Sequence, residues 1–212
     1  MEVNYEKVED LLFWSGKMED KTNYIPPQFF DKLLEWTSNN TYESLESKDV
    51  VMMYKITKEL ALRINEVLRL KKEQFDFDFN TCNLGDTKTK KADVTTIPNS
   101  FLPELKAWLE TKPNGYLFRN KQGKPIARQT VWKWLKDAGK ALGLKALTTP
   151  QTETHEKTVT HIFRKSKGKD MIFNDKAPLN IVQGKLRHNN LTTTSEYLKV
   201  KLEAVQEWEA QH

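Results

Sequence analysis

The chain has 212 residues, of which 38% are hydrophobic and 30% are charged, a composition that indicates a folded protein rather than a disordered one. Lys and Arg exceed Asp and Glu by 34 to 29, and the net charge of +5 permits a polyanionic partner without requiring one. The single cysteine excludes an internal disulfide and a multi-cysteine zinc site, and no His-Glu-x-x-His spacing occurs, so neither a metal nor a cofactor is expected. No apolar run reaches membrane-spanning length, so we expect an intracellular protein with no membrane partner.

The first predicted elements are helices that follow a short lead-in. Residues 1–25 combine an apolar cluster with a polar stretch and are interpreted as a lead-in or the remnant of a linker, which places the domain at 26–212. Pro27 opens a helix whose apolar face begins with Phe29 and Phe30. The helical pattern at about 45–70 predicts two further helices.

The hydrophobic period then changes from helical to alternating. Phe75, Phe77 and Phe79 alternate with acidic residues, which predicts a strand with one buried face. Residues 74–97 are therefore expected to form a small sheet with a basic tip at 88–91. Helices are predicted after it at about 100–111, 128–141, 158–173, 178–187 and 193–212, with a polar loop at 143–157. The fold class is mainly α with a small three-stranded antiparallel sheet (α+β).

Four segments carry residues suited to phosphate chemistry. Arg63 and Glu66 lie three positions apart, and a planar guanidinium held by a carboxylate is suited to gripping a phosphate. His161 and Arg164 share a helix face, where an imidazole and a guanidinium can stabilise the charge of a pentacoordinate phosphate. Taken alone, the first pair is more simply explained as an exposed ion pair, and the second as a chance histidine and arginine on a surface helix.

The other two segments carry a tyrosine and a group of lysines. Tyr197 follows His188 by nine positions, across a hydroxyl-rich turn. A lysine at the predicted hairpin tip can protonate a leaving oxygen, and Lys88, Lys90 and Lys91 lie there. An isolated tyrosine is usually a packing residue, and a lysine-rich tip is usually a solvated turn.

Taken in this order, the four segments resemble the tyrosine recombinase family of phage integrases and Xer-like enzymes, over about residues 26–205. The stretch Gln129-Thr130-Val131-Trp132 is similar to the family's helix that precedes its His-x-x-Arg segment. The resemblance implies a catalytic domain with a C-terminal helix. It also implies a site-specific DNA recombinase or integrase that cleaves and rejoins strands through a 3′-phosphotyrosyl intermediate, without a metal or a cofactor.

The resemblance also assigns roles to individual residues. The six catalytic residues that it implies are Arg63, Lys88, His161, Arg164, His188 and Tyr197. The two arginines clamp the scissile phosphate, and the two histidines hydrogen-bond it or assist proton movement. The lysine protonates the departing 5′-oxygen, and the tyrosine attacks. Glu66 orients the first arginine. Lys90 is the close alternative to Lys88 as the acid.

The chain departs from the family pattern at two positions. Ala61 stands where a glycine usually precedes the first arginine by two residues, and Arg187 stands where a glycine usually precedes the second histidine.

The expected partner is double-stranded DNA, with self-association on it as a dimer to tetramer. The residues expected to contact DNA are Lys90, Lys91, Arg128, Gln129, Lys133 and Lys165. Two alternatives stay open: a type IB topoisomerase-like enzyme that nicks and closes strands, and a catalytically inactive DNA-binding module of the same fold.

Overall fold

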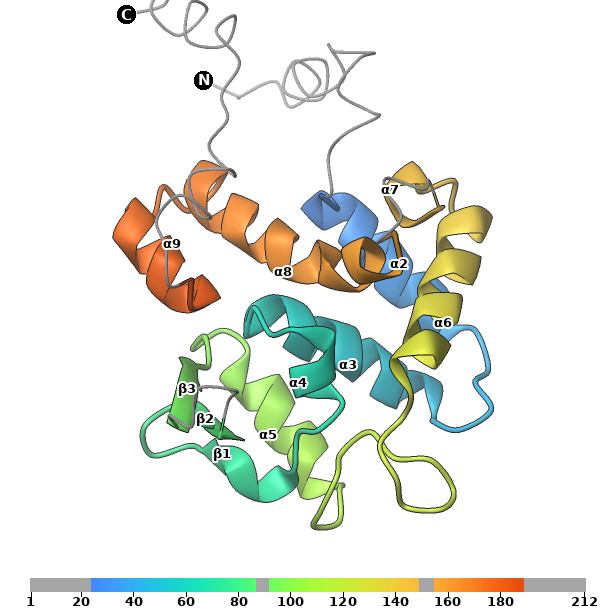
Figure 1. Cartoon of the computed structure of the whole chain (residues 1–212), viewed down its shortest axis with the longest axis horizontal. Coiled ribbons are helices and arrows are strands. Elements are labelled where there is room, and N and C mark those ends of the chain that lie inside the picture. The colour runs from blue at the N-terminus through green and yellow to red at the C-terminus, as the bar shows by residue number, and fades with distance from the viewer. Residues whose placement is uncertain (1–23, 87–91, 149–154, 189–212) are drawn as a thin grey trace, which may run out of the picture.

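The computed structural model describes residues 24–86, 92–148 and 155–188, and shows helices gathered around one small sheet (Figure 1). The helices are α2 (Pro27–Ser38), α3 (Ser47–Glu59), α4 (Ile64–Val67), α5 (Leu102–Glu110), α6 (Arg128–Ala141), α7 (Lys145–Thr148), α8 (His155–Phe173) and α9 (Leu179–Leu186). A 3-10 turn, η1 (Lys72–Gln74), leads into the sheet. The predicted fold class, mainly α with a small antiparallel sheet, is confirmed.

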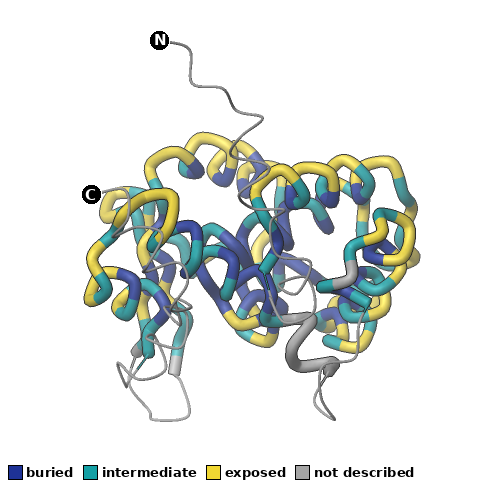
Figure 2. The backbone as a smooth tube through the Cα atoms, turned by 90° about the horizontal axis from the view of Figure 1, so that it is seen from above, coloured by how far each residue is buried: buried dark blue, intermediate teal, exposed yellow. Residues whose placement is uncertain are grey.

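Helix α3 is the centre of the core, because α2 and α8 both pack against it. Its sequence buries side chains on most sides, including Val50, Met53, Tyr54 and Ile56. The surrounding helices are amphipathic, so buried residues face inward and exposed residues face outward (Figure 2). Pro27 occupies the first turn of α2, as predicted.

The sheet consists of β1 (Phe75–Asp76), β2 (Thr81–Asp86) and β3 (Ala92–Thr96), antiparallel and in that order. Cys82 of β2 is buried and lies between Phe75 and Thr95 in the register. The predicted strand through Phe79 was wrong. The Asp76 carboxylate accepts hydrogen bonds from the backbone N–H groups of residues 78 and 79, which turns the chain and leaves Phe79 79% exposed.

Two other predictions need correction. The segment 143–157 is not one loop, because α7 forms within it and α8 begins at His155. Helix α7 packs on α6 where Gly139 has no side chain, and a Cβ there would lie 2.5 Å from Leu147 Cβ. In the pattern at 45–70, the second predicted helix is only the single turn α4. The helix predicted at 193–212 lies outside the described residues.

The first described residues are already part of the packed domain. Ile25 donates its backbone N–H to Ser166 Oγ at 2.9 Å, and the Tyr24 hydroxyl donates to Asp170 at 2.9 Å. The lead-in predicted at 1–25 otherwise lies outside the described residues, and the boundary stays a prediction. Within the described ranges, no helix is long and apolar enough to cross a bilayer.

Candidate active site

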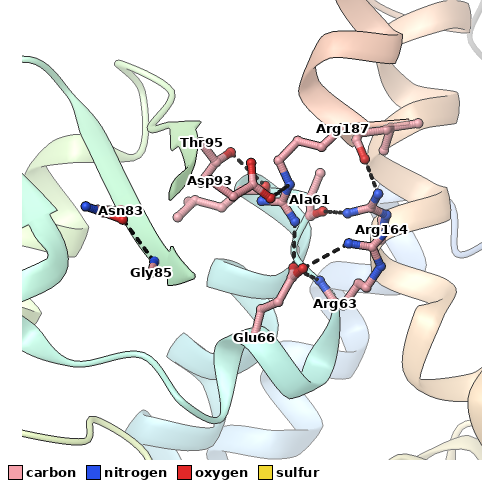
Figure 3. Close-up of polar contacts among 11 residues, drawn as sticks. Ala61, Arg63, Glu66, Asn83, Gly85, Asp93, Thr95, Arg164 and Arg187 are labelled. Carbon is pink, nitrogen blue, oxygen red and sulfur yellow. Dashed lines mark hydrogen bonds and ion pairs between the residues drawn. The ribbon is translucent and has the colours of Figure 1, made fainter. Parts of the chain in front are cut away.

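Arg164 is the buried arginine of the site and joins three elements. Its side chain is on α8, and the residue is only 3% exposed. Nη1 donates to the carbonyl of Ala61 at 2.7 Å, and Nη2 donates to the carbonyl of Leu186 at the end of α9 (Figure 3). Ile162 and Phe163, the two residues before Arg164 on α8, are buried in the core and fix the helix and therefore this guanidinium.

Ala61 presents its carbonyl to Arg164 from a left-handed turn between α3 and α4. Its φ is 51°, a region where a residue with a Cβ pays about 1–2 kcal/mol. The left-handed turn accounts for the glycine that the resemblance placed here. In this chain an alanine adopts the same conformation and buries its methyl group against Val182 and Leu186.

Arg63 and Glu66 form the predicted pair at the start of α4. The Arg63 backbone N–H donates to Glu66 Oε2 at 2.7 Å, and Nη1 donates to Oε1 at 2.9 Å. The Arg63 side chain is 47% exposed, because the residue is the N-cap of a one-turn helix. Burial alone would raise the pKa of Glu66, but the charge of Arg187 and the contacts with Arg63 outweigh burial and lower it.

Arg187 is the member of this cluster that the sequence analysis did not assign. It caps α9 with a φ of 50° and points its side chain toward α4 and β3 (Figure 3). Nη2 lies 2.6 Å from Glu66 Oε2, and Nε lies 3.1 Å from Asp93 Oδ2. The only signal for it in the sequence is a bulky cation at a position where the family pattern has glycine.

His161 lies one turn before Arg164 on α8. Burial, followed by the positive charges of Arg164, Arg63 and Lys165, lowers the pKa of His161 to about 4. The imidazole is therefore neutral at neutral pH, and each neutral ring has one N–H to donate. Lys165 itself is half-buried beside Arg164.

The remaining predicted residues are placed in part. His188 directly follows Arg187, and its backbone N–H donates to Gln183 at 3.2 Å. On α6, Gln129 and Lys133 are exposed and Arg128 is half-buried. Four of the predicted site residues lie outside the described ranges: Lys88, Lys90, Lys91 and Tyr197. Among the described residues, no group of three or more His, Cys, Asp or Glu side chains could hold a metal ion.

Curated relatives are similar to this chain over about two thirds of its length. Tyrosine recombinase XerA of Thermococcus onnurineus (strain NA1) is 32% identical over 147 residues, which is 67% of this chain and 48% of that protein. A tyrosine recombinase of Thermosipho africanus (strain TCF52B) is 31% identical over 142 residues, 66% of this chain and 45% of its own length. The chain spans about half the length of these relatives.

Solved structures share the fold. A XerA recombinase superposes with a TM-score of 0.63 at 20% identity, covering 89% of this chain and 64% of that one. The catalytic domain of bacteriophage HP1 integrase gives 0.61 at 16% identity, covering 88% and 92%. XerH bound to its difH substrate in a post-cleavage complex gives 0.65 at 21% identity, covering 88% and 52%.

The model of the phage integrase family matches residues 24–203, almost the whole range over which the sequence suggested the resemblance. Together with relatives that are themselves tyrosine recombinases, this match confirms the prediction: the chain belongs to the phage integrase family of tyrosine recombinases.

Proposed function

We propose that this protein is a site-specific DNA recombinase or integrase that cleaves and rejoins DNA strands through Tyr197. The observation that carries the proposal is the fixed Arg164 guanidinium, which ties α8 to the turn before Arg63 and to the turn before His188. One side chain thereby gathers three of the four segments that the chemistry requires.

In the proposed reaction, the phenolic oxygen of Tyr197 attacks the scissile phosphorus. A P–O bond forms to the tyrosine, and the bond to the 5′-oxygen breaks. A phenol with an ordinary pKa near 10 is a weak nucleophile at neutral pH, so the cleavage depends on neighbours that stabilise the developing charge. Arg63 and Arg164 supply two guanidiniums, and neutral His161 supplies a hydrogen-bond donor beside them.

The departing 5′-oxygen receives its proton from a lysine, Lys88 or Lys90. The 3′-phosphotyrosyl link conserves the energy of the broken bond, so a second 5′-hydroxyl can reverse the step on the same or another strand. His188 hydrogen-bonds the phosphate or accepts the proton that the Tyr197 phenol loses as its P–O bond forms. No metal or cofactor enters this scheme, since the cationic side chains carry the electrostatic stabilisation.

Double-stranded DNA is the proposed partner, bound inside the cell, with two to four copies assembling on it. The proposed contacts to the DNA are Lys90, Lys91, Arg128, Gln129, Lys133 and Lys165. The named relatives and structures are recombinases and integrases, one of them bound to its DNA substrate. These names favour strand exchange over the topoisomerase-like alternative.

The test is covalent trapping on DNA. The full chain is incubated in EDTA with a pool of nicked duplexes of randomised sequence, and adducts are resolved by denaturing electrophoresis and sequenced. We expect an adduct with the wild type and none with Tyr197→Phe. Tyr116→Phe is the matched control, because it removes another phenol, half-buried beside Lys71, and should leave the adduct unchanged. An adduct that persists in Tyr197→Phe, or none with the wild type, would overturn the proposal.

A second arm of the same assay identifies the acid. A 5′-bridging phosphorothiolate in the trapped sequence replaces the leaving alcohol by a thiol, which has a far lower pKa and leaves without a proton donor. We expect Lys88→Ala to slow cleavage of the normal substrate strongly and to cleave the phosphorothiolate as fast as the wild type does. If Lys90→Ala shows this rescue instead, the role belongs to Lys90.

A further inference from the structure

We propose that Arg187 is a positioning residue of the cleavage site, which fixes Glu66 and thereby orients Arg63. The inference deepens the proposed function and rests on it. It assigns a task to a cation that occupies a position where a backbone with positive φ favours glycine.

The contacts place Arg187 between two carboxylates from two other elements. Its side chain is 10% exposed, Nη2 donates to Glu66 Oε2 at 2.6 Å, and Nε is 3.1 Å from Asp93 Oδ2. The Nε contact is an ion pair without hydrogen-bond alignment, and Nη1 has no hydrogen-bond acceptor among the described residues. One guanidinium thus connects the end of α9 to α4 and β3 (Figure 3).

Arg63 needs such support because its own environment holds it weakly. Its side chain is about half exposed, and an exposed ion pair by itself holds a side chain only weakly, because water screens the attraction. Glu66 is better buried, and Arg187 is the opposite charge that lowers its pKa most. With Oε2 shared between Arg187 and the Arg63 backbone N–H, Oε1 is directed at Arg63 Nη1.

The charge balance favours positioning over direct binding of the phosphate. Two carboxylates already compensate the Arg187 charge. Arg63, by contrast, has Glu66 as its one ion-pair partner in the part of the chain that the structure describes, and its half-exposed side chain remains accessible to DNA. Burying a charged cluster costs desolvation free energy, and glycine would satisfy the backbone of residue 187 without that cost. The arginine is therefore better explained by the geometry that it imposes than by fold stability.

The main variant is Arg187→Gly, since glycine suits the φ of 50° and keeps the turn while the guanidinium is lost. Cleavage of the trapped sequence is measured as a single-turnover rate constant at saturating DNA, and the Kd is measured separately. We expect cleavage to slow about 10- to 100-fold, as for a lost charged hydrogen bond, with the Kd changed by less than about 3-fold. Arg187→Lys keeps the charge without the fork and should recover only part of the rate.

The matched control is Lys176→Gly, which removes an exposed cation from a residue with nearly the same φ, 54°, just before α9. It should cleave at the wild-type rate. An equal loss in both glycine variants, or an unchanged rate in Arg187→Gly, would overturn the inference. A Kd weakened as much as the rate would show that Arg187 binds the DNA directly.

Two comparisons separate positioning from a general structural role. If Arg187 acts through Glu66, adding Arg187→Gly to Glu66→Gln should slow cleavage no further, whereas multiplied losses would contradict the inference. The second comparison is the pH profile of cleavage. Loss of the Arg187 charge removes one of the causes that lower the pKa of Glu66, so this pKa should rise above its wild-type value and the acid limb of Arg187→Gly should move to higher pH. The other groups that face Glu66 are Arg63 on its own element and His161 on α8, and both remain in the variant.

A readout that needs no cleavage keeps this inference distinct from the proposed function. The guanidinium ¹⁵N signals of Arg63, assigned by comparison with Arg63→Lys, report how freely that side chain rotates. We expect restricted rotation in the wild type and faster rotation in Arg187→Gly. The same restriction in both proteins would overturn the inference, even if the wild type forms the adduct. If Arg63 rotates faster in Arg187→Gly than in the wild type but the wild type forms no adduct, only the proposed chemistry is overturned.

Discussion

The Arg164 guanidinium has two tasks, because the group that is proposed to bind phosphate also donates hydrogen bonds to two backbone carbonyls. Its partners, Ala61 and Leu186, are 103 and 22 residues away in sequence. Removal of this arginine would leave buried acceptors without donors, at about 1–3 kcal/mol each. Loss of stability should therefore accompany loss of activity in Arg164→Ala, so its effect on cleavage has to be measured where the variant is still folded.

The depressed pKa of His161 predicts a specific pH dependence of stability. The unfolded imidazole takes up a proton near pH 6.5, whereas in the folded state it does so only near pH 4. The unfolded state therefore binds more protons between these values, and the free energy of unfolding falls as pH drops from about 6.5 toward 4. Glu66 adds to this loss only near and below pH 4.5, the ordinary pKa of the unfolded carboxyl, because its folded pKa is lower than that value.

We expect His161→Gln to remove this part of the acid sensitivity. Urea unfolding at pH 7.5 and pH 5.0 measures it: the wild type should lose about 1–2 kcal/mol more than the variant between the two values. The chain's other three histidines are common to both proteins and cancel in the comparison. Equal losses would mean that His161 titrates normally and that its surroundings do not exclude the charged form.

At this scale the sequence predicted pairs that lie close along the chain and missed those that do not. Arg63 with Glu66, and His161 with Arg164, were found because their spacing places them on one helical turn. Arg187, by contrast, lies 94 positions after Asp93 and 121 positions after Glu66, the two carboxylates that it contacts. Helical spacing carries no information about contacts of that kind.

Among the elements, the packing of α7 on α6 depends on a missing side chain. A Cβ on Gly139 would lie 2.5 Å from Leu147 Cβ and 3.0 Å from Thr148 Cγ2. Leu147 Cβ is fixed to its backbone, so no side-chain rotation relieves the closer of the two contacts. Gly139→Ala should therefore destabilise the protein by about 1–3 kcal/mol, despite alanine's better helix propensity. Chemical denaturation measures the change.

Gly184 of α9 is the matched control, since nothing lies within 4 Å of a Cβ built there. Gly184→Ala should stabilise by up to about 1 kcal/mol, because alanine loses less backbone entropy in a helix. A Gly139→Ala variant as stable as the wild type would show that α7 moves away at little cost.

Elements were predictable where local preferences decide the structure. Helix α6 runs from Arg128 to Ala141, as its amphipathic pattern predicted. The strand through Phe79 was lost to hydrogen bonds from the Asp76 side chain, and the four-residue α7 is too short for any period to appear. Its stability comes from contacts with α6, which the local sequence does not encode.

For the whole molecule, the mild positive charge predicts salt-dependent DNA binding. Each phosphate contact that is lost should reduce the slope of log K against log [salt] by about 0.9. We expect Lys133→Ala, an exposed residue of α6, to show this reduction in Kd measurements across salt concentrations. Lys32→Ala removes an exposed lysine of α2 that was not predicted to contact DNA, so its slope should match the wild type. Equal slopes for all three proteins would remove Lys133 from the interface.

The family could be predicted from the order of the four segments, and the match over residues 24–203 agrees with the range inferred from them. The way in which the segments meet was not predictable. Arg164 binds the backbone carbonyls of Ala61 and Leu186, and any residue type can provide a carbonyl, so no sequence pattern marks these two positions.

Cys82 gives the molecule a built-in reporter. It is the single cysteine of the chain, it lies buried in β2, and burial raises the pKa of its thiol to about 12. A thiol held this way is nearly inert to alkylating reagents until the sheet separates from the helices that cover it. The rate of labelling by a maleimide dye therefore times the opening of the sheet next to Asp93, with no engineered probe and with DNA present or absent.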